Sequence, residues 1–572
     1  MNYKQHIAEL LHALPAFAEL PELDIPTLYA QIETPDREKG DFAFPCFRLA
    51  KALKQAPPAI ATELASQIAT NDWIEQAVAT GPYINFFINK AHLAQSVLTH
   101  ALSAGNDLGR SNTGAGKNVV IDYSSPNIAK PFHVGHLRST VIGQALYNIH
   151  EHLGYNSIGV NHLGDWGTQF GKLIVAYRMW SNADEIKTGG IPALNALYVR
   201  YHDAAKLDPS LDDQARQVLL QMEQGNEEDL ATWRFFYDIS MQAFEQVYGK
   251  LGVSFDHYTG ESFYQDKMQP VLDELDAKGL TEISEGARIV NLDQFKLAPC
   301  LVLRADGGTL YHTRDLATAF YRKATFDFDK VLYVTASDQS LHFSQLFRVI
   351  ERMGYDWSAD MYHVPFGLVS LETGKLSTRS GNVVLMEELI ESAVAKVADI
   401  IEEKNPNLAN KAQVAEQIGV GAIVFNDLYN QRIKDVTFSF EKMLSFEGET
   451  GPFVQYAHAR ATTLLNKASI NIEPSTIDFS VLNDPESQNL LYDIYFLGDK
   501  IQEAADKLEP YLLTRHMVAT ASHFNKFYQT HKILDDSVPQ ATKHARLALV
   551  KVTRDMIRIG LGLLGIQAPE QM

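Results

Sequence analysis

The most informative segment of the chain is Ser124-Ser125-Pro126-Asn127-Ile128-Ala129-Lys130-Pro131-Phe132-His133-Val134-Gly135-His136-Leu137-Arg138-Ser139-Thr140. The apolar run Val119-Val120-Ile121 precedes it and predicts a strand. Apolar residues then recur every four positions from Leu137 through Val141, Ala145 and Ile149 to Leu153, which predicts one face of a helix that stops at Gly154. The two histidines therefore belong to a strand-to-helix crossover, at or just before a helix N-terminus.

This crossover has the chemistry of a nucleotide triphosphate site. Unpaired backbone N–H groups and the helix dipole favour an anion at a helix N-terminus. Gly135 lacks a side chain that would keep a flat ligand off the backbone, and Lys130 and Arg138 add positive charge. The imidazole groups would stabilise the charge that grows on a phosphate during displacement. A His-x-Gly-His pattern by itself is weak, because a pair of surface histidines explains it equally well.

Strand and helix patterns alternate around the crossover from 118 to about 385. Further strands are predicted at Ile158-Gly159-Val160, Leu301-Val302-Leu303 and Val331-Leu332-Tyr333-Val334, and an acidic helical stretch interrupts them from Ala183 to Ala243. This order predicts an α/β fold with a Rossmann-like, doubly wound parallel sheet. Ligands of such sheets bind outside the carboxyl ends of the strands, where the crossover lies.

The other regions predict separate domains. Residues 1–108 read as a small α/β domain, and 109–385 as the catalytic domain, with a helical insertion at about 183–260. Residues 386–450 read as a helical connecting segment. Residues 451–572 read as an all-helical bundle, whose helices are separated at Pro474, Pro485, Pro510 and Pro539.

Composition narrows the class of protein. The chain has 572 residues, of which 46% are hydrophobic and 21% charged, so it contains enough hydrophobic residues to form several hydrophobic cores. Cys46 and Cys300 stand far apart, which excludes a disulfide framework and fits a reducing cytoplasm. We expect neither a secretion signal nor a membrane span. The net charge of −20 argues against a general nucleic-acid binder but allows a narrow basic track.

A second motif, far along the chain, suits the same chemistry. Residues 366–382 run from a predicted strand, which includes Leu368 and Val369, into a glycine-flanked loop that contains Lys375, Ser377 and Arg379. Such a loop is able to close on a pyrophosphate leaving group. A solvated surface turn is the alternative interpretation.

Together the two motifs resemble the "HIGH" and "KMSKS" signatures of class I aminoacyl-tRNA synthetases, and most closely the bacterial type of arginyl-tRNA synthetase. Four further stretches resemble that family in the expected order, namely residues 163–171 (Leu-Gly-Asp-Trp-Gly-Thr-Gln-Phe-Gly), 311–317 (Tyr-His-Thr-Arg-Asp-Leu-Ala), 455–460 (Gln-Tyr-Ala-His-Ala-Arg) and 563–570 (Leu-Leu-Gly-Ile-Gln-Ala-Pro-Glu). The matches cover nearly the whole chain, which is more specific than any single motif.

One departure from the family pattern concerns the loop. Thr378 stands where the common loop has its second lysine, and Arg379 follows it. The resemblance to arginine enzymes with a changed loop implies that Lys130 is able to supply this charge, and Arg379 is the alternative. A compact ammonium in the crossover is able to reach the same phosphates.

The resemblance implies a set of site residues. The catalytic set is His133, Gly135, His136, Lys130, Lys375, Ser377 and Arg379, and the ATP-binding set is Pro126, Ala129, Phe132, His133, Gly135, His136, Leu368, Val369 and Lys375. The arginine-binding set is Asp122, Ser124, Asn127, His162, Tyr311, Asp315 and Gln339. A guanidinium needs carboxylates at fixed angles, which suits Asp122 and Asp315, and Tyr311 could stack on it. As an alternative, Asp315 is an acid at a helix N-terminus.

The implied reaction has two steps: arginine and ATP give arginyl-adenylate and pyrophosphate, and the arginyl group then moves to the terminal ribose of tRNA(Arg). Mg²⁺ would arrive with ATP, and we expect no structural metal. The C-terminal bundle would bind the anticodon through Tyr456, His458, Arg460, Phe524 and Tyr528, unless these are core residues. The N-terminal domain would touch the outer corner of the tRNA. We expect a cytoplasmic monomer.

Two other functions stay open at this point. A small-molecule nucleotidylyltransferase could share the His-x-Gly-His crossover, but it would not need a long helical C-terminus. A catalytically idle relative that only binds tRNA is the non-enzyme alternative. The presence of His133, Gly135, His136 and Lys375 argues against it.

Overall fold

The computed structural model of the chain describes residues 2–18, 20–305, 307–371, 374–375, 384–468, 472 and 477–572, with only the backbone of Leu371, Gly374 and Lys375. The chain divides into two compact units. The first combines Met1–Asn106 with Leu464–Phe496 and Ser522–Asp555, and the second combines Asp107–Thr463 with Leu497–Ala521 and Met556–Met572.

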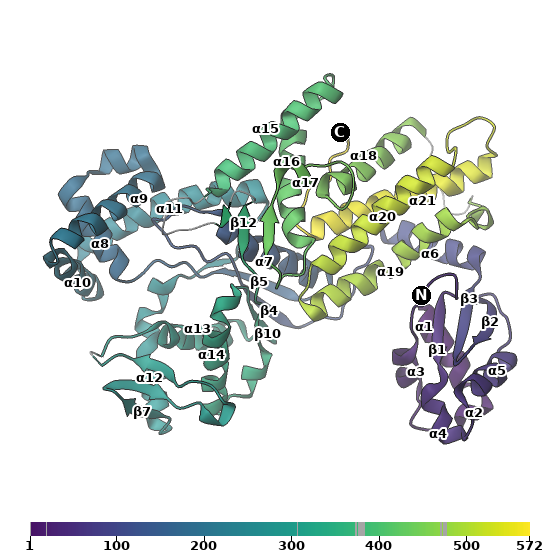
Figure 1. Cartoon of the computed structure of the whole chain (residues 1–572), viewed down its shortest axis with the longest axis horizontal. Coiled ribbons are helices and arrows are strands. Elements are labelled where there is room, and N and C mark those ends of the chain that lie inside the picture. Colours follow the sequence, from purple (N-terminus) through teal and green to yellow (C-terminus); the bar gives the residue numbers. More distant parts are fainter. Residues whose placement is uncertain are drawn as a thin grey trace. The chain divides into compact units, whose positions relative to one another are not determined.

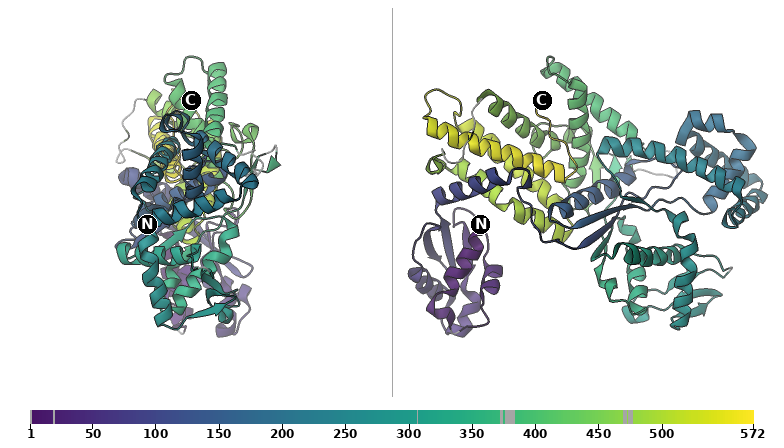
Figure 2. Two further views of the ribbon diagram at one scale, coloured as in Figure 1. Left: turned by 90° about the vertical axis from the view of Figure 1, so that its left-hand side faces the viewer. Right: turned by 180° about the vertical axis from the view of Figure 1, so that it is seen from behind.

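The N-terminal part of the first unit is a three-stranded antiparallel sheet with helices packed around it, drawn in purple in Figure 2. The strand order is β1-β3-β2, and Phe42 pairs with Phe86 in the register of β1 and β3. Its elements are α1 (Tyr3–His12), α2 (Pro15–Ala18), α3 (Ile25–Gln31), β1 (Phe42–Pro45), α4 (Leu49–Leu53), α5 (Pro57–Gln67), β2 (Ile74–Thr80), β3 (Tyr83–Ile88) and α6 (Lys90–Ala104).

The second unit is built around a five-stranded sheet in the order β11-β10-β4-β5-β6. All of its pairings are parallel, as the sequence predicts for a doubly wound fold. The strands are β4 (Asn118–Asp122), β5 (Asn156–Asn161), β6 (His257–Tyr258), β10 (Lys330–Tyr333) and β11 (Met361–His363). From β4 the chain proceeds to β5 on one side, while β10 lies on the other side. The carboxyl end of β4 is therefore the topological switch point, where ligands of such sheets bind.

Helices cover the sheet because parallel strands are buried on both faces. On one face, Val120, Val160 and Val331 pack in a cluster with Leu316 and Leu346. These last two residues lie on α13 (Tyr311–Phe326) and α14 (Ser340–Arg352), which lie beside β10 in Figure 1. The crossover after β4 leads into α7 (Val134–His152), where the four-residue apolar spacing predicts a helix.

One predicted strand of the parallel sheet belongs elsewhere. Residues 301–303 lie in β9 (Cys300–Leu303), which pairs antiparallel in the separate sheet β7-β8-β9, so their assignment to the doubly wound sheet is wrong. The partners are the neighbouring strands β7 (Thr281–Ser284) and β8 (Ala287–Val290), preceded by α12 (Met268–Ala277). A short apolar run predicts a strand but not the strand with which it pairs, and here β9 pairs with β8 of the preceding hairpin.

The acidic stretch forms the predicted helices. They are α9 (Ala183–Leu207), α10 (Ser210–Glu223) and α11 (Glu227–Leu251). The helix α8 (Thr168–Trp180) precedes the stretch, and α8, α9 and α10 gather at one end of this unit in Figure 1. The rest of the second unit contains β12 (Val369–Leu371), β13 (Gly374–Lys375), α15 (Met386–Lys404), α16 (Lys411–Leu428), β14 (Val436–Phe438) and α17 (Phe440–Met443).

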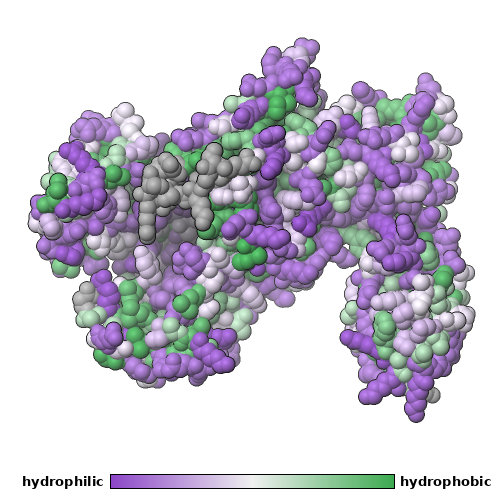
Figure 3. Space-filling view, viewed as in Figure 1, coloured by the Kyte–Doolittle hydropathy of each residue, from purple (hydrophilic) through white to green (hydrophobic). Residues whose placement is uncertain are grey.

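Four long helices follow, each of which contributes residues to both units: α18 (Gly451–Ala468), α19 (Pro485–Lys507), α20 (Tyr511–Thr530) and α21 (Gln540–Leu563). Pro485 opens α19, and Pro510 and Pro539 stand immediately before α20 and α21, where a missing N–H is harmless. No helix in the described part of the chain is long and apolar enough to span a bilayer. On the face shown in Figure 3, hydrophilic surface predominates and the apolar patches are small.

Candidate active site

The first turn of α7 satisfies its own backbone donors. His133 is the N-cap residue, and its Nδ1 accepts a hydrogen bond from Gly135 N at 3.0 Å. The Nδ1 of His136 reaches back to His133 N at 3.2 Å, which completes a capping box made of two imidazoles. Val134 N donates to Val384 O. The expectation that this turn offers unpaired backbone N–H groups to an anion is therefore wrong.

The donors available to a phosphate are the imidazoles. Because Nδ1 of each ring accepts a backbone N–H, the proton of the neutral ring lies on Nε2. Burial lowers the pKa of His133, and the charge of Lys130 lowers it further. Burial together with the charge of His133 lowers the pKa of His136 to about 3. The two rings, 3.9 Å apart at their centroids, are thus a pair of neutral N–H donors at neutral pH.

Gly135 is required by its neighbour more than by a ligand. A Cβ at this position would lie 2.7 Å from Cε1 and 2.8 Å from Nδ1 of His133. Any side chain at 135 would push the His133 ring out of its capping position. The glycine therefore permits the imidazole to fold over the helix start, which is a different reason from the flat-ligand approach that the sequence suggests.

The crossover itself is strained. Ser124, Ser125 and Ala129 all have positive φ angles, of 71°, 48° and 59°, which side-chain-bearing residues rarely adopt. The buried Ser124 Oγ lies 2.8 Å from the hydroxyl of Tyr248, and Ala129 N donates to Ser240 Oγ at 2.8 Å. Tyr248 and Ser240 belong to α11, so the helical insertion holds the strained loop in place.

Asn127, a predicted arginine-binding residue, and Asp165, in the motif 163–171, occupy contrasting places. Asn127 is exposed and lies against Gly164, where a Cβ would come within 2.1 Å of its Oδ1. Gly164 N donates to Pro126 O, which ties the 163–171 motif to the crossover. Asp165 is buried and accepts from the backbone N and the Oγ of Ser262, so it is scaffold.

Lys130 and Arg138, the two cations that flank the histidines, lie in different environments. Lys130 is partly buried, its Nζ lies 5.6 Å from the ring centre of Tyr198, and burial lowers its pKa. Arg138 is fully buried and pairs with Asp427 of α16 at 2.9 Å, so its predicted role as a charge beside the ligand is wrong. Its Nη1 donates to the carbonyls of Gly367 and Lys434 instead.

The second motif returns to the first. Arg138 holds Gly367, just before β12, and β12 pairs with β13, in which Lys375 lies opposite Ser370. After the loop, Met386 N donates to Phe132 O at 3.0 Å, and Leu385 forms a bridge with His133. Both ends of the loop are thus attached to the His133 region. Ser377, Thr378 and Arg379 lie outside the described residues, as does the side chain of Lys375.

Among the nucleotide-site candidates, Phe132 is 6% exposed and packs on His136, Phe244 and Tyr248. Pro126 and Ala129 are also buried, and Val369 is half-buried. Leu368 is 59% exposed, at the start of the strand that leads to the loop. An apolar side chain so exposed beside a polar loop suits contact with a flat base.

Asp122 ends β4 and is already engaged. Its Oδ2 pairs with Arg322 at 2.8 Å and its Oδ1 accepts from Ser125 Oγ at 2.9 Å. The carboxylate is 7% exposed and Arg322 is fully buried. If Asp122 binds a cationic ligand, its carboxylate is therefore shared between that ligand and Arg322.

Asp315 is the fifth residue of α13, whose first turn contains no acidic residue, so the alternative interpretation as an acid at a helix N-terminus is wrong. Its Oδ2 lies 2.6 Å from Nε2 of His342. His162 lies near both carboxylates: burial lowers its pKa, while the charges of Asp122 and Asp315 act in the opposite direction. Its Nδ1 is buried without a hydrogen-bond partner among the described residues.

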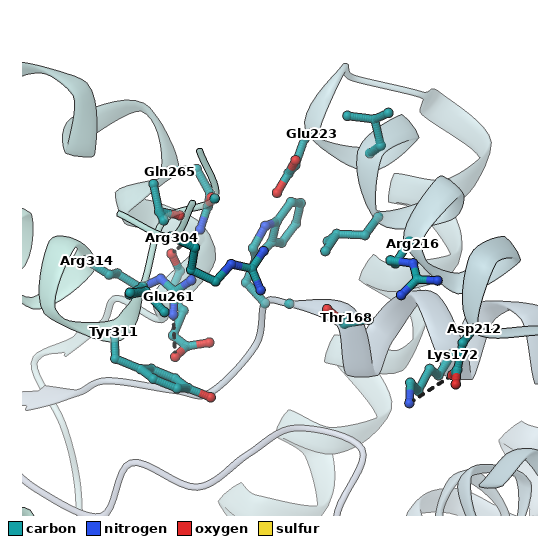
Figure 4. Close-up of a pocket in the computed structure, with 17 residues that line it drawn as sticks. Thr168, Lys172, Asp212, Arg216, Glu223, Glu261, Gln265, Arg304, Tyr311 and Arg314 are labelled. Atoms are coloured by element: carbon teal, nitrogen blue, oxygen red, sulfur yellow. Dashed lines mark hydrogen bonds and ion pairs between the residues drawn. The ribbon is translucent and has the colours of Figure 1, made fainter. Parts of the chain in front are cut away.

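Tyr311 opens α13 and is 68% exposed, and Gln339 ends the short 3-10 turn that precedes α14. Tyr311 borders a polar cavity of about 670 Å³, shown in Figure 4. Glu261 and Arg314 face each other in this cavity at 2.7 Å. Burial raises the pKa of Glu261 to about 7, although Arg314 opposes the shift. Sequence reasoning missed Glu261, which carries no motif signal.

The predicted anticodon contacts divide by burial. His458 is 2% exposed and its Nδ1 contacts Pro569 O, and Phe524 is fully buried. Both predictions of direct base contact are therefore wrong, since a buried ring has no free face. Tyr456 is 36% exposed with the guanidinium of Arg460 4.6 Å from its ring centre, and Tyr528 is 39% exposed.

Comparison with known proteins covers the whole chain. Residues 97–440 match the family described as tRNA synthetases class I (R), catalytic domain. Residues 454–572 match the DALR anticodon binding domain, and 1–88 match the arginyl tRNA synthetase N terminal domain. The chain is 50% identical to the arginine–tRNA ligase of Alkaliphilus metalliredigens over 572 residues, all of both chains. It is 48% identical to that of Clostridioides difficile, over 97% of this chain and 98% of the relative.

Solved structures have the same fold. Arginyl-tRNA synthetase of Thermus thermophilus superposes with a TM-score of 0.83 at 24% identity, over all of both chains. That of Plasmodium falciparum superposes with a TM-score of 0.81 at 24% identity, over 100% of this chain and 99% of the other. With the paired motifs joined at one site and the full-length similarity above, the chain belongs to the arginine–tRNA ligase family of class I tRNA synthetases.

Proposed function

We propose that the chain activates L-arginine with ATP to arginyl-adenylate and then transfers the arginyl group to the 3′-terminal ribose of tRNA(Arg), with release of AMP and pyrophosphate. The observation that carries this proposal is the return of Leu385 and Met386 onto His133 and Phe132, which joins two motifs 240 residues apart. A site for one small nucleotide transfer needs no DALR domain, which disfavours the nucleotidylyltransferase alternative.

In the first step, the carboxylate of arginine attacks the α-phosphate and pyrophosphate leaves. The Nε2–H groups of His133 and His136 would donate to phosphate oxygens as their charge grows. Lys130 and Lys375 would neutralise the leaving pyrophosphate, with Ser377 and Arg379 as further predicted loop contacts. Catalysis of this kind relies on positioning and fixed donors, which do not reorganise during the reaction.

We expect Mg²⁺ to enter with ATP. Among the described residues, the candidates at the helix start are Lys130, His133 and His136, none of which is a carboxylate. Carboxylate oxygen is the usual protein ligand of Mg²⁺, so this donor set fits an ion that is carried by the phosphates. Leu368, Val369 and the crossover residues Pro126, Ala129 and Phe132 would line the nucleoside.

The amino acid would be recognised by its guanidinium. Among the described residues, no hydrogen-bond donor contacts Oδ1 of Asp315, and Tyr311 is an exposed ring beside it on α13. Asn127 would bind the α-amino and carboxylate end, and Asp122, Ser124, His162 and Gln339 would shape the surrounding pocket. A planar fork between fixed acceptors excludes lysine, whose ammonium cannot make two parallel hydrogen bonds.

Tyr456, Arg460 and Tyr528 are the exposed candidates for stacking on unpaired tRNA bases. The N-terminal domain would contact the outer corner of the tRNA. With a net charge of −20, we expect affinity that depends on a narrow basic track and weakens with salt. We infer a monomer that works in the cytoplasm, where tRNA is charged for translation.

Attachment of labelled amino acids to tRNA tests the proposal. We expect ATP-dependent attachment of arginine and of none of the other standard amino acids. Attachment without ATP, or transfer of another amino acid, would contradict it. Pyrophosphate exchange measures adenylate formation, and Lys130→Ala should slow this exchange far more than it weakens tRNA binding. Normal pyrophosphate exchange by that variant would exclude the role of Lys130.

A further inference from the structure

The carboxylate of Asp315 is held from one side only. Nε2 of His342, on the first turn of α14, lies 2.6 Å from Oδ2 of Asp315. Among the described residues, no hydrogen-bond donor contacts Oδ1. The side chain of Asp315 is 25% exposed and that of His342 is 17% exposed, so the contact is largely shielded from water but lies next to the solvent.

The contact has a defined donor and acceptor. Burial by itself raises the pKa of Asp315, but the hydrogen bond and the charge of His342 outweigh it, and the pKa lies below the ordinary value. Asp315 is therefore an ionised carboxylate that only accepts, so the proton lies on Nε2 of His342. A charge-assisted bond of this kind is stronger than a neutral one.

His342 is itself fixed by its neighbours. Its ring lies 4.1 Å from that of His312 and makes an edge contact with Phe343 at 5.3 Å. His312 is anchored through Gln345, whose amide N donates to the carbonyls of Ala298 and Pro299. The Oε1 of Gln345 must then accept from Nε2 of His312, at 3.2 Å. A chain of oriented groups thus runs from the start of β9 to Asp315.

We propose that His342 is a positioning residue for amino-acid recognition: it holds Oδ2 of Asp315 so that Oδ1 faces the guanidinium of arginine. The inference rests on the proposed role of Asp315. A free Asp side chain rotates about its terminal torsion, whereas a planar guanidinium needs its acceptor in one plane. The hydrogen bond to His342 removes that freedom before the substrate arrives, which reduces the entropy lost on binding.

The test compares two substitutions in the full-length protein. His342→Leu removes the donor, and His342→Gln places an amide N near the position of Nε2. In ATP–pyrophosphate exchange with tRNA present, we expect His342→Leu to raise the KM for arginine about tenfold, the loss of one charge-assisted hydrogen bond. The KM for ATP should stay within about twofold of the unmodified protein, and His342→Gln should recover most of the loss.

A matched control is His363→Leu. His363 also makes a side-chain hydrogen bond, to Thr335 Oγ1 at 2.9 Å, and also packs on Phe343, but it has no contact with Asp315. Its loss should leave the KM for arginine unchanged. An equal rise in that KM for His363→Leu, or an equal rise in both KM values for His342→Leu, would show that repacking is responsible and would overturn the inference.

Asp315→Asn separates the inference from the proposal beneath it. If Asp315→Asn leaves the KM for arginine unchanged, the role of Asp315 fails and the inference fails with it. If Asp315→Asn raises the KM but His342→Leu does not, only the inference fails. Should His342 act through Asp315, adding His342→Leu to Asp315→Asn will produce no further rise, whereas a purely structural residue would add its own effect.

Discussion

The buried pair of Arg138 and Asp427 supports a prediction about stability. Arg138 lies on the helix that carries the two histidines, and Asp427 lies on α16. Both side chains have no exposed surface, and Nε and Oδ1 are 2.9 Å apart. Burial raises the pKa of Asp427, while Arg138 acts against this shift. Replacement of Asp427 by Leu keeps the branched shape of the side chain but leaves a cation unpaired in the interior.

The expected loss follows from that unpaired charge. Removal of one partner of a buried ion pair costs about 3–5 kcal/mol. Because Nη1 keeps its bonds to the Gly367 and Lys434 carbonyls, we expect the lower end, about 3 kcal/mol. At about 2–4 °C per kcal/mol for a domain of 150–250 residues, the transition of the second unit should fall by roughly 6–12 °C, or somewhat less for its larger size.

Differential scanning calorimetry of the full chain measures this shift. The control is the pair of Asp203 and Lys206, which has a similar distance of 2.8 Å but side chains that are 69% and 74% exposed. Asp203→Ser should leave the transition unchanged. The double variant Arg138→Met, Asp427→Leu should melt above Asp427→Leu, because no buried charge is left. A melting temperature of Asp427→Leu within about 2 °C of that of the unmodified chain would contradict the cost assigned to the unpaired charge.

Three further predictions concern protonation, the crossover and the tRNA. Burial lowers the pKa of His136 to about 3 and of His150 to about 4, so the unfolded chain takes up protons below about pH 6.5 that the folded chain does not. Each group should therefore cost up to about 1.4 kcal/mol of stability per pH unit between about 6.5 and 4, and an unchanged melting temperature from about pH 7.5 to 5.5 would contradict this. Gly135→Ala should displace the capping imidazole and lower pyrophosphate exchange at least about tenfold, whereas Gly249→Ala, with open space around its Cβ, should not; equal rates would exclude the steric argument. Tyr456→Ala should weaken tRNA binding in a filter assay without a change in arginine-dependent KM for ATP, and unaltered binding would remove this residue from the tRNA contact.

Secondary structure is predictable from the sequence where the residues that form it lie close together along the chain. The apolar spacing after Leu137 predicts α7, and the prolines mark the starts of α19, α20 and α21, because helix periodicity and capping involve residues a few positions apart. The parallel sheet also follows from the alternation of strands and helices. Strand partnership did not follow, as β9 shows, since the same apolar run fits either sheet.

Burial of polar and aromatic residues was the main source of error. Tyr456 and His458 are two positions apart on one helix, yet one is exposed and the other is core. Aromatic spacing cannot distinguish these faces when several helices pack around one another. The prediction that Arg138 lies beside the ligand is wrong for a similar reason. Its ion-pair partner Asp427 lies 289 positions away, and no local sequence pattern indicates that the two residues pair.

Local sequence patterns predict the strand, the helix and the position of His133 and His136 at their junction, and the family motifs occur in the expected order. The contacts of these side chains depend instead on residues that are brought together by the fold. Both Nδ1 atoms accept backbone N–H groups at the helix start, so the neutral rings carry their protons on Nε2, and His342 contacts Asp315. The reason is physical: secondary structure depends on neighbours along the chain, whereas the pKa, the tautomer and the orientation of a buried group depend on neighbours in space.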